Sequence, residues 1–148
     1  MQTQEVESFS QIVHRLRSDA RKEKRAGHNV AISRTQKDEC DLVAGIYSNI
    51  ANQIEGANCL QQYHMCHIIS SLVMDSRLLK ESDERNGKPY KLFGIPLTIT
   101  FGRLAWQLYR AANISRKFWL EYLKETHSDP KGMDKHLRRC FRDRRCSR

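Results

Sequence analysis

The stretch LVAGIYSNIANQI, from Leu42 to Ile54, decides the fold class of this 148-residue chain. Its apolar residues recur at intervals of three and four, a spacing that places them on one broad face of an α-helix. Ser33 and Gln36 have the spacing of a capping box, which predicts the start of this helix, and Gly56 predicts its end. The sequence therefore predicts a long helix whose apolar face belongs to the core.

Helical patterns continue on both sides of this stretch. A narrow seam of apolar residues between residues 5 and 26 predicts an N-terminal helix that ends at Gly27. A third apolar stripe predicts a helix over residues 58–80. A polar linker is expected to follow it and to end in a tight turn at Asn86 and Gly87.

The C-terminal part combines one extended segment with shorter helices. Pro96 disfavours a helix, and the alternating apolar residues around it predict a short extended arm or hairpin near residues 88–100. Thr100 and Ser115 are expected to start two helices, and a short basic amphipathic helix is expected from residue 130 onward. The expected fold is mainly all-α, a compact helical domain of about five helices.

Length and hydropathy bound the organisation of the chain. A chain of this length fits one domain, which we expect to span residues 1–129, with residues 130–148 as a basic C-terminal helix or tail. No stretch approaches the roughly 18 apolar residues of a membrane helix. Residues 1–11 are polar and acidic, unlike a secretory signal. We therefore expect no membrane contact and a cytoplasmic protein, or a nuclear one in a eukaryotic cell.

Positive charge is concentrated in two segments of the sequence. The chain carries 26 Lys and Arg against 17 Asp and Glu, a net charge of +9. Residues 14–37 hold eight basic and two acidic residues, and residues 130–148 hold the same numbers. Clustered basic residues attract polyanions, which predicts nucleic-acid binding. A solvated helix face or an acidic protein partner would explain the same clusters.

The stretch from Ala112 to Leu123 carries the most informative pattern. It reads ANISRKFWLEYL and resembles the turn and second helix of a helix-turn-helix DNA-binding motif. The positions that carry the resemblance are the turn residue, the next apolar residue, the cap and two inward-facing residues: Asn113, Ile114, Ser115, Trp119 and Tyr122. Tyr109 departs from the pattern, because a small residue usually stands where the two helices touch. An ordinary helical hairpin with a capped second helix is the alternative.

The resemblance implies which side chains would face a DNA groove. They are Ser115, Arg116, Lys117, Leu120, Glu121 and Lys124. Arg116 and Lys117 would contact guanine edges or phosphates, and Glu121 could accept a hydrogen bond from cytosine. The basic segments add candidate phosphate contacts: Arg21, Lys22, Lys24, Arg25, Arg138, Arg139, Arg142, Arg144 and Arg145.

Five cysteines and six histidines raise the question of a metal site. Two sets have metal-ligating residue types: Cys59, His64, Cys66 and His67, and also His127, His136, Cys140 and Cys146. Neither set contains the close cysteine pair of a zinc knuckle, and an odd number of cysteines favours reduced thiols. We therefore expect no metal and no cofactor, with zinc at either set as the alternative.

The sequence carries no recognisable catalytic motif. It has no glycine-rich phosphate loop and no nucleophile-elbow or metalloprotease signature, so an enzyme is not expected. Four aromatic residues at helical spacing could stack unpaired bases, although packing in the core explains the same spacing. They are Trp106, Tyr109, Trp119 and Tyr122.

These patterns together predict a small basic DNA-binding protein. We expect a transcriptional or replication regulator that uses residues 100–125 as a helix-turn-helix-like element and its basic ends to contact phosphates on duplex DNA. The narrow N-terminal seam also predicts a homodimer, because such helices commonly pair with a second copy. Two alternatives stay open: a helical protein-interaction module or inhibitor that binds an acidic protein, and an RNA-binding helical protein.

Overall fold

The computed structural model describes residues 8–28, 33–56, 61–87, 91–92 and 95–146, with side chains except those of residues 35, 91, 92, 95, 96 and 141–146. These residues form six helices, and the predicted mainly α-helical class is confirmed. None of the described helices combines the length and apolarity needed to cross a membrane. Contacts divide the chain into two compact units, residues 1–59 and 60–148, a division that does not coincide with the expected boundary before residue 130.

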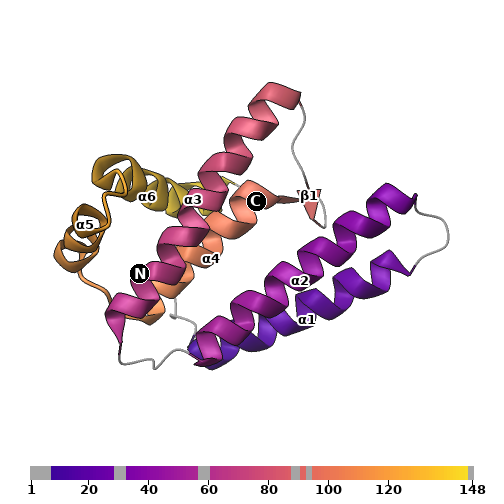
Figure 1. Cartoon of the computed structure of the whole chain (residues 1–148), viewed down its shortest axis with the longest axis horizontal. Helices are drawn as coiled ribbons and strands as arrows, with labels where there is room; N and C mark the ends of the chain where they lie inside the picture. Colours follow the sequence, from indigo (N-terminus) through magenta and orange to yellow (C-terminus); the bar gives the residue numbers. More distant parts are fainter. Residues whose placement is uncertain (1–7, 29–32, 57–60, 88–90, 93–94, 147–148) are drawn as a thin grey trace. The chain divides into compact units, whose positions relative to one another are not determined.

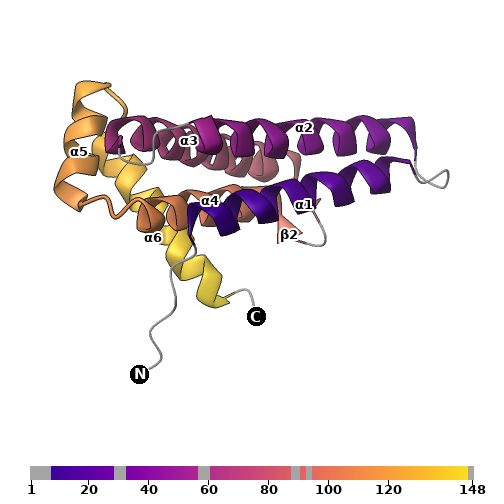
Figure 2. The same cartoon turned by 90° about the horizontal axis from the view of Figure 1, so that it is seen from below.

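The first unit contains two helices, α1 (Phe9–Gly27) and α2 (Arg34–Gly56), which lie side by side in both ribbon views (Figures 1 and 2). A capping box precedes each helix. Ser8 Oγ accepts a hydrogen bond from the Gln11 backbone N–H at 3.2 Å, and Ser8 N–H donates to Gln11 Oε1 at 2.8 Å. Ser33 and Gln36 repeat this arrangement at 3.2 and 3.0 Å, which confirms the predicted start of α2.

Most of the described residues in the N-terminal seam of α1 are buried, and Phe9 is half-buried. Ile12 is fully buried, Leu16 is 3% exposed and Ala20 is 4% exposed. In α2, Tyr47 is 1% exposed and Ala51 is fully buried. Because α1 packs along α2, most of the described seam is covered within the chain, so a second copy is not needed to bury it. The oligomeric state itself stays a prediction.

Polar contacts also join α1 to α2. The Arg17 guanidinium donates to Glu55 Oε2 at 2.6 Å on the surface of the pair. Glu23 is only 6% exposed and accepts a hydrogen bond from the Cys40 thiol. Burial raises the pKa of the Glu23 carboxyl, the Cys40 hydrogen bond opposes that change, and Asp19 adds to it.

The second unit begins with α3 (Gln62–Asn86), β1 (Lys91–Leu92), β2 (Ile95–Pro96) and α4 (Leu97–Ala111). It ends with α5 (Arg116–Glu125) and α6 (Pro130–Cys146). The two short strands pair antiparallel, and α4 packs against both α3 and α6. The core of this unit contains side chains with no exposed surface: Leu108, Trp119, Leu123, Met133 and Leu137.

Two element boundaries in this unit differ from the prediction. The helix α3 continues to Asn86 and ends at Gly87, whose φ of 75° suits a helix C-terminus, so the expected linker over residues 80–86 is helical. The helix α4 begins at Leu97, so the extended segment stops at Pro96 instead of reaching residue 100. A proline is tolerated there because the first residues of a helix have no intrahelical acceptor for their N–H groups.

A buried polar network joins α3, α4 and α6. Ser76 is 1% exposed; its Oγ donates to the Thr98 carbonyl at 2.7 Å and lies 2.8 Å from His136 Nε2. Beside it, Gly102 faces Cys140 so closely that a Cβ at position 102 would overlap the sulfur. Because Ser76 is inaccessible, its contact with His136 joins the helices and does not present a nucleophile to a substrate.

A candidate nucleic-acid interface on α5 and α6

A tight turn connects α4 to α5. Asn113 adopts a left-handed φ of 52°, a conformation that asparagine tolerates better than most residues, and Ile114 is 6% exposed. Ser115 is the N-cap, and its Oγ accepts a hydrogen bond from the Phe118 backbone N–H at 3.1 Å. The turn, the buried apolar residue and the cap are therefore all found where the resemblance to a helix-turn-helix motif places them.

Large rings occupy the inward face of α5. Trp119 and Tyr122 are buried, and the Trp119 ring meets the Tyr109 ring edge to face with centroids 6.2 Å apart. Tyr109, from α4, therefore stands where the motif usually has a small residue. Among the described residues, the α5 backbone approaches α6 and α3 more extensively than it approaches α4. The two helices of the motif are thus held together by rings and not by close backbone contact.

The outward face of α5 is polar and accessible. Five of the six predicted groove-facing side chains are exposed: Ser115, Arg116, Lys117, Glu121 and Lys124. The sixth, Leu120, is half-buried. Lys117, Glu121 and Lys124 follow one another at intervals of four and three, so they share one face of the helix. The structure therefore brings these predicted contacts together on one short helix.

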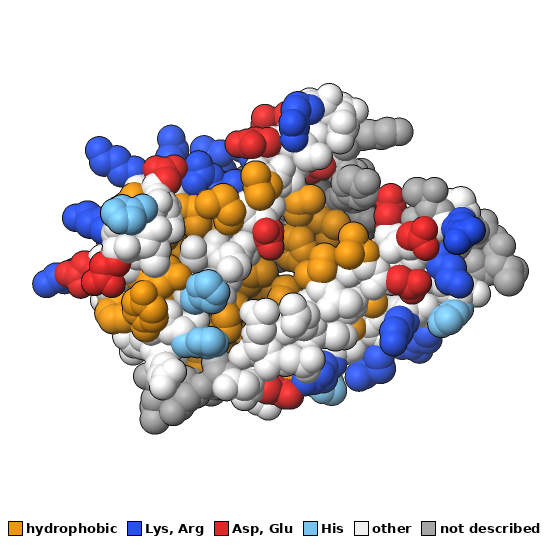
Figure 3. Space-filling view, viewed as in Figure 1, with side chains coloured by type: hydrophobic (Ala, Val, Ile, Leu, Met, Phe, Trp, Pro, Cys, Tyr) orange, Lys and Arg blue, Asp and Glu red, His pale blue; other side chains and the backbone are white. Residues whose placement is uncertain are grey.

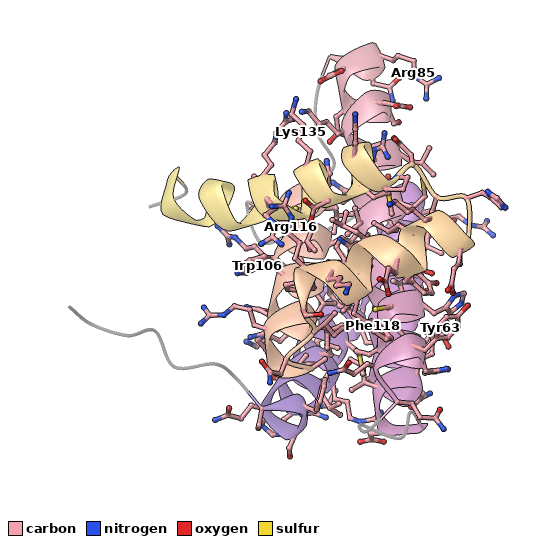
Figure 4. The ribbon with its side chains drawn as sticks, turned by 90° about the vertical axis from the view of Figure 1, so that its left-hand side faces the viewer. Tyr63, Arg85, Trp106, Arg116, Phe118 and Lys135 are labelled. Atoms are coloured by element: carbon pink, nitrogen blue, oxygen red, sulfur yellow. The ribbon has the colours of Figure 1, made fainter. Side chains whose placement is uncertain are left out.

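Arg116 differs from the other residues on this helix because it is ion-paired. Its Nη2 lies 3.0 Å from Oδ2 of Asp134, a carboxylate from α6 that is 5% exposed. Arg138 Nε lies 3.4 Å from the other oxygen of the same carboxylate. Figure 4 shows Arg116 between α5 and α6. Asp134 therefore connects the first turn of α5 to α6 through its hydrogen bond with Arg116, and it forms a longer ion pair with Arg138.

Basic side chains gather over α6 (Figure 3). Lys131 and Lys135 are exposed, whereas Arg138 and Arg139 are half-buried. Three further predicted contacts lie on the last turns of α6, outside the described side chains: Arg142, Arg144 and Arg145. Within residues 130–140, Asp134 is the sole acidic residue, and it is buried between arginines. The accessible surface of residues 130–140 is therefore positively charged.

The remaining predicted contacts lie in the first unit. They are four exposed residues on the C-terminal half of α1: Arg21, Lys22, Lys24 and Arg25. Glu23, between them in the sequence, is buried. Lys24 and Arg25 are in its last turn, where cations also stabilise the negative end of the helix dipole. These four basic residues and the α5 and α6 residues therefore belong to separate units.

The cysteines and histidines do not assemble into a metal site within the described part of the chain, where no group of three His, Cys, Asp or Glu side chains could hold an ion. Burial raises the pKa of the Cys66 thiol to about 12, so it is protonated at neutral pH. His67 Nδ1 lies 3.4 Å from the Tyr122 hydroxyl. Cys59 and the Cys146 side chain lie outside the described residues.

The four aromatic residues predicted as stacking candidates differ in burial. Trp119, Tyr122 and Tyr109 are 0, 4 and 7% exposed and belong to the core. Trp106 is half-buried and stacks on Tyr109 with centroids 5.5 Å apart and an angle of 19° between the ring planes. Core packing is therefore the explanation for three of the four, and Trp106 is the outermost ring.

Asp134 is a site residue that we did not predict from the sequence. In the sequence it counts only as an acidic residue that lowers the charge of a basic segment. The four-residue spacing from Asp134 to Arg138 is typical of an ion pair on one helix and was the available signal. The contact with Arg116 spans eighteen residues and has no local signature.

The chain matches no protein-family model, no curated protein and no solved structure. A functional assignment for this fold therefore depends on the chemistry and geometry of α5 and α6 themselves.

Proposed function

We propose that this protein binds duplex DNA through its second unit and acts as a small transcriptional or replication regulator. In this proposal the outward face of α5 enters the major groove, and the basic surface of α6 contacts phosphates. One observation carries it: α5 is a Ser-capped helix that follows a tight turn, buries one face and presents Lys117, Glu121 and Lys124 on the other. This is how a recognition helix is held in helix-turn-helix proteins.

Each residue of that face has a role that fits its chemistry. Lys117 can donate to guanine O6 and N7, and Glu121 can accept from cytosine N4. Ser115 and Lys124, at the two ends of the face, suit phosphates or either base type. Arg116 has one donor committed to Asp134, so it suits a phosphate beside the helix better than a bidentate guanine contact.

The charge of α6 supports the same proposal. Lys131 and Lys135 are one turn apart and exposed, Asp134 between them is buried against Arg116 and Arg138, and the exposed Asp129 before the helix is ion-paired with Arg77. A phosphate approaching this helix would therefore meet cations without an exposed carboxylate from residues 130–140. Such contacts position a protein on DNA but do not read its sequence.

The test compares specific with non-specific binding. A preferred duplex would be selected from a random-sequence pool, and affinities for it and for a random duplex would be measured by fluorescence anisotropy at one salt concentration. Lys117→Ala should weaken binding to the selected duplex by about 1–3 kcal/mol and affect the random duplex much less, because base contacts are made only at the preferred site. The matched control Lys131→Ala should weaken both about equally.

Three results would contradict parts of the proposal. If Lys117→Ala and Lys131→Ala change both affinities alike, α5 packs against the unit without reading bases. If single-stranded RNA binds more tightly than every duplex, the RNA-binding alternative replaces the proposal. If no nucleic acid binds at low salt, a module for an acidic protein partner replaces it.

A further inference from the structure

A row of aromatic rings leads from the core of the second unit toward its surface. Trp119 is fully buried, Tyr109 contacts it edge to face, and Trp106 stacks on Tyr109. Trp106 is half-buried, whereas the other two rings are buried.

An arginine fixes the outer end of this row. The Arg138 guanidinium carbon lies 5.7 Å from the centroid of Trp106 and 5.6 Å from that of Tyr109, within the range of a cation–π interaction. Arg138 Nη2 also donates to the Tyr109 hydroxyl at 3.4 Å, and its Nε faces Asp134. The ring and the guanidinium are therefore held in place before any ligand arrives.

The helix that carries Trp106 is positively charged on the same face. Arg103 and Arg110 precede and follow Trp106 by three and four residues, so all three share one side of α4. The α4 sequence contains no acidic residue. Aromatic rings flanked by cations are the features with which proteins bind unpaired nucleotides, because each base has a face to stack and each phosphate needs a cation.

We infer that Trp106 and Arg138 form a stacking site for an unpaired base, so that the preferred ligand is duplex DNA with an adjacent single-stranded extension. This inference rests on the proposed function. The same carboxylate, Asp134, contacts Arg138 at the stacking site and Arg116 at the start of α5. Figure 4 shows Trp106 and Arg116 on the same side of α6, with Lys135 on its other side. In this arrangement one nucleic acid would contact α5 with its duplex and Trp106 with its first unpaired base.

The experiment compares a blunt duplex with the same duplex that carries a single-stranded thymidine extension of about six nucleotides. Full-length protein should bind the extended probe at least about fivefold more tightly, since stacking of one base on an aromatic ring supports a difference of that order. Trp106→Ala should abolish this preference and leave the affinity for the blunt duplex within about twofold. Trp106→Phe should retain part of it.

Tyr63→Ala is the matched control, because Tyr63 is a 54% exposed aromatic residue on α3 of the same unit. It should leave the preference for the extended probe unchanged. Two results would overturn the inference without affecting the proposed function. The preference for the extended probe could persist in Trp106→Ala, or the unsubstituted protein could bind the blunt duplex without preferring the extended probe. Failure of both probes to bind at low salt overturns both.

Tryptophan fluorescence provides a second measurement that does not require the alanine variant to fold. The chain has two tryptophans, and Trp119 is fully buried. The extended probe should quench the fluorescence of the unsubstituted protein, because a stacked base lies against Trp106, and should leave Trp106→Phe unquenched. Quenching that persists in Trp106→Phe would place the base elsewhere and overturn the inference.

Discussion

Asp134 shows how one buried charge can organise a surface. It is 5% exposed and lies between Arg116 and Arg138, so its negative charge is compensated by two cations from two helices. A buried carboxylate with such partners is costly to disturb, because neutralising it leaves Arg116 without a charged acceptor and Arg138 without its counter-charge.

Asp134→Asn should therefore lower the free energy of unfolding by about 1–3 kcal/mol, measured by urea denaturation. The expected cost is below that for fully buried pairs because Arg116 is largely exposed. Glu121→Gln, which alters an exposed carboxylate on α5, should change stability by less than about 0.5 kcal/mol. Equal effects of the two substitutions would show that Asp134 does not connect α5 to α6.

Gly102 and Gly45 differ in the space available for a side chain. A Cβ at Gly102 would overlap the Cys140 sulfur, whereas a Cβ at Gly45 would meet no atom within 4 Å. Gly102→Ala should lower the free energy of unfolding of the second unit by about 1–3 kcal/mol. The fluorescence of its two tryptophans would monitor this unfolding. Gly45→Ala should stabilise α2 by about 0.5–1 kcal/mol, followed by circular dichroism. A neutral Gly102→Ala would mean that α4 and α6 do not pack this closely.

Glu23 should make the stability of the first unit depend on pH. Its pKa is raised by burial in the folded state, so the folded protein holds the proton more tightly than the unfolded chain. Stability should therefore fall as the pH rises above about 4.3, the ordinary glutamate value, and level off above the folded pKa. Glu23→Gln should remove this decline, measured as unfolding free energy at several pH values. Asp38→Asn, at an exposed position on α2, should leave the decline in place.

At the scale of the element, the cap of α5 is the feature most open to test. Ser115 Oγ satisfies the Phe118 N–H at the start of a ten-residue helix that is too short to be stable alone. Ser115→Ala should cost about 1 kcal/mol in unfolding free energy. Ser115→Asp should retain most of the stability because aspartate also caps helices. A destabilisation by both substitutions would contradict the capping role.

Local sequence signals predicted some elements well and others poorly. The start of α2 at Ser33 and the start of α5 after Ser115 were predictable, because a cap acts within three residues of its own position. The end of α3 at Asn86 was not predicted because residues 80–86 are polar, and a polar segment resembles a linker. Glu, Lys and Arg nevertheless favour helices, which explains why this segment is helical. The start of α4 was missed because β-branched residues after Pro96 alternate like a strand, and packing against α3 and α6 prevails over that preference.

The candidate site was predictable to the extent that it follows helical periodicity. The exposed positions of α5 come from its repeat, and the buried Trp119 and Tyr122 follow from the same repeat. The ion pair of Arg116 with Asp134 and the position of Arg138 over Trp106 depend on how three helices pack. Such contacts join residues that are far apart in the sequence, and no local pattern encodes them.

At the scale of the whole molecule, a net charge of +9 is distributed between α1 of one unit and α6 of the other. In the proposed function, the positive charge of α6 binds the phosphates of DNA. Each phosphate that a cation neutralises releases counterions, so the affinity of a protein that binds several phosphates falls steeply with salt concentration. The charge of α6 should contribute a separable part of that dependence.

The most direct test is the salt dependence of binding to a random duplex. With about five to eight phosphates bound, the logarithm of the affinity should fall with the logarithm of salt concentration at a slope of about −5 to −7. Replacing Arg139, Arg142, Arg144 and Arg145 by alanine should make the slope shallower by about 0.9 for each phosphate that is no longer bound. The control pair Lys80→Ala and Arg85→Ala on α3 should leave it unchanged. A slope that the α6 substitutions do not alter, or the absence of binding at low salt, would contradict the account.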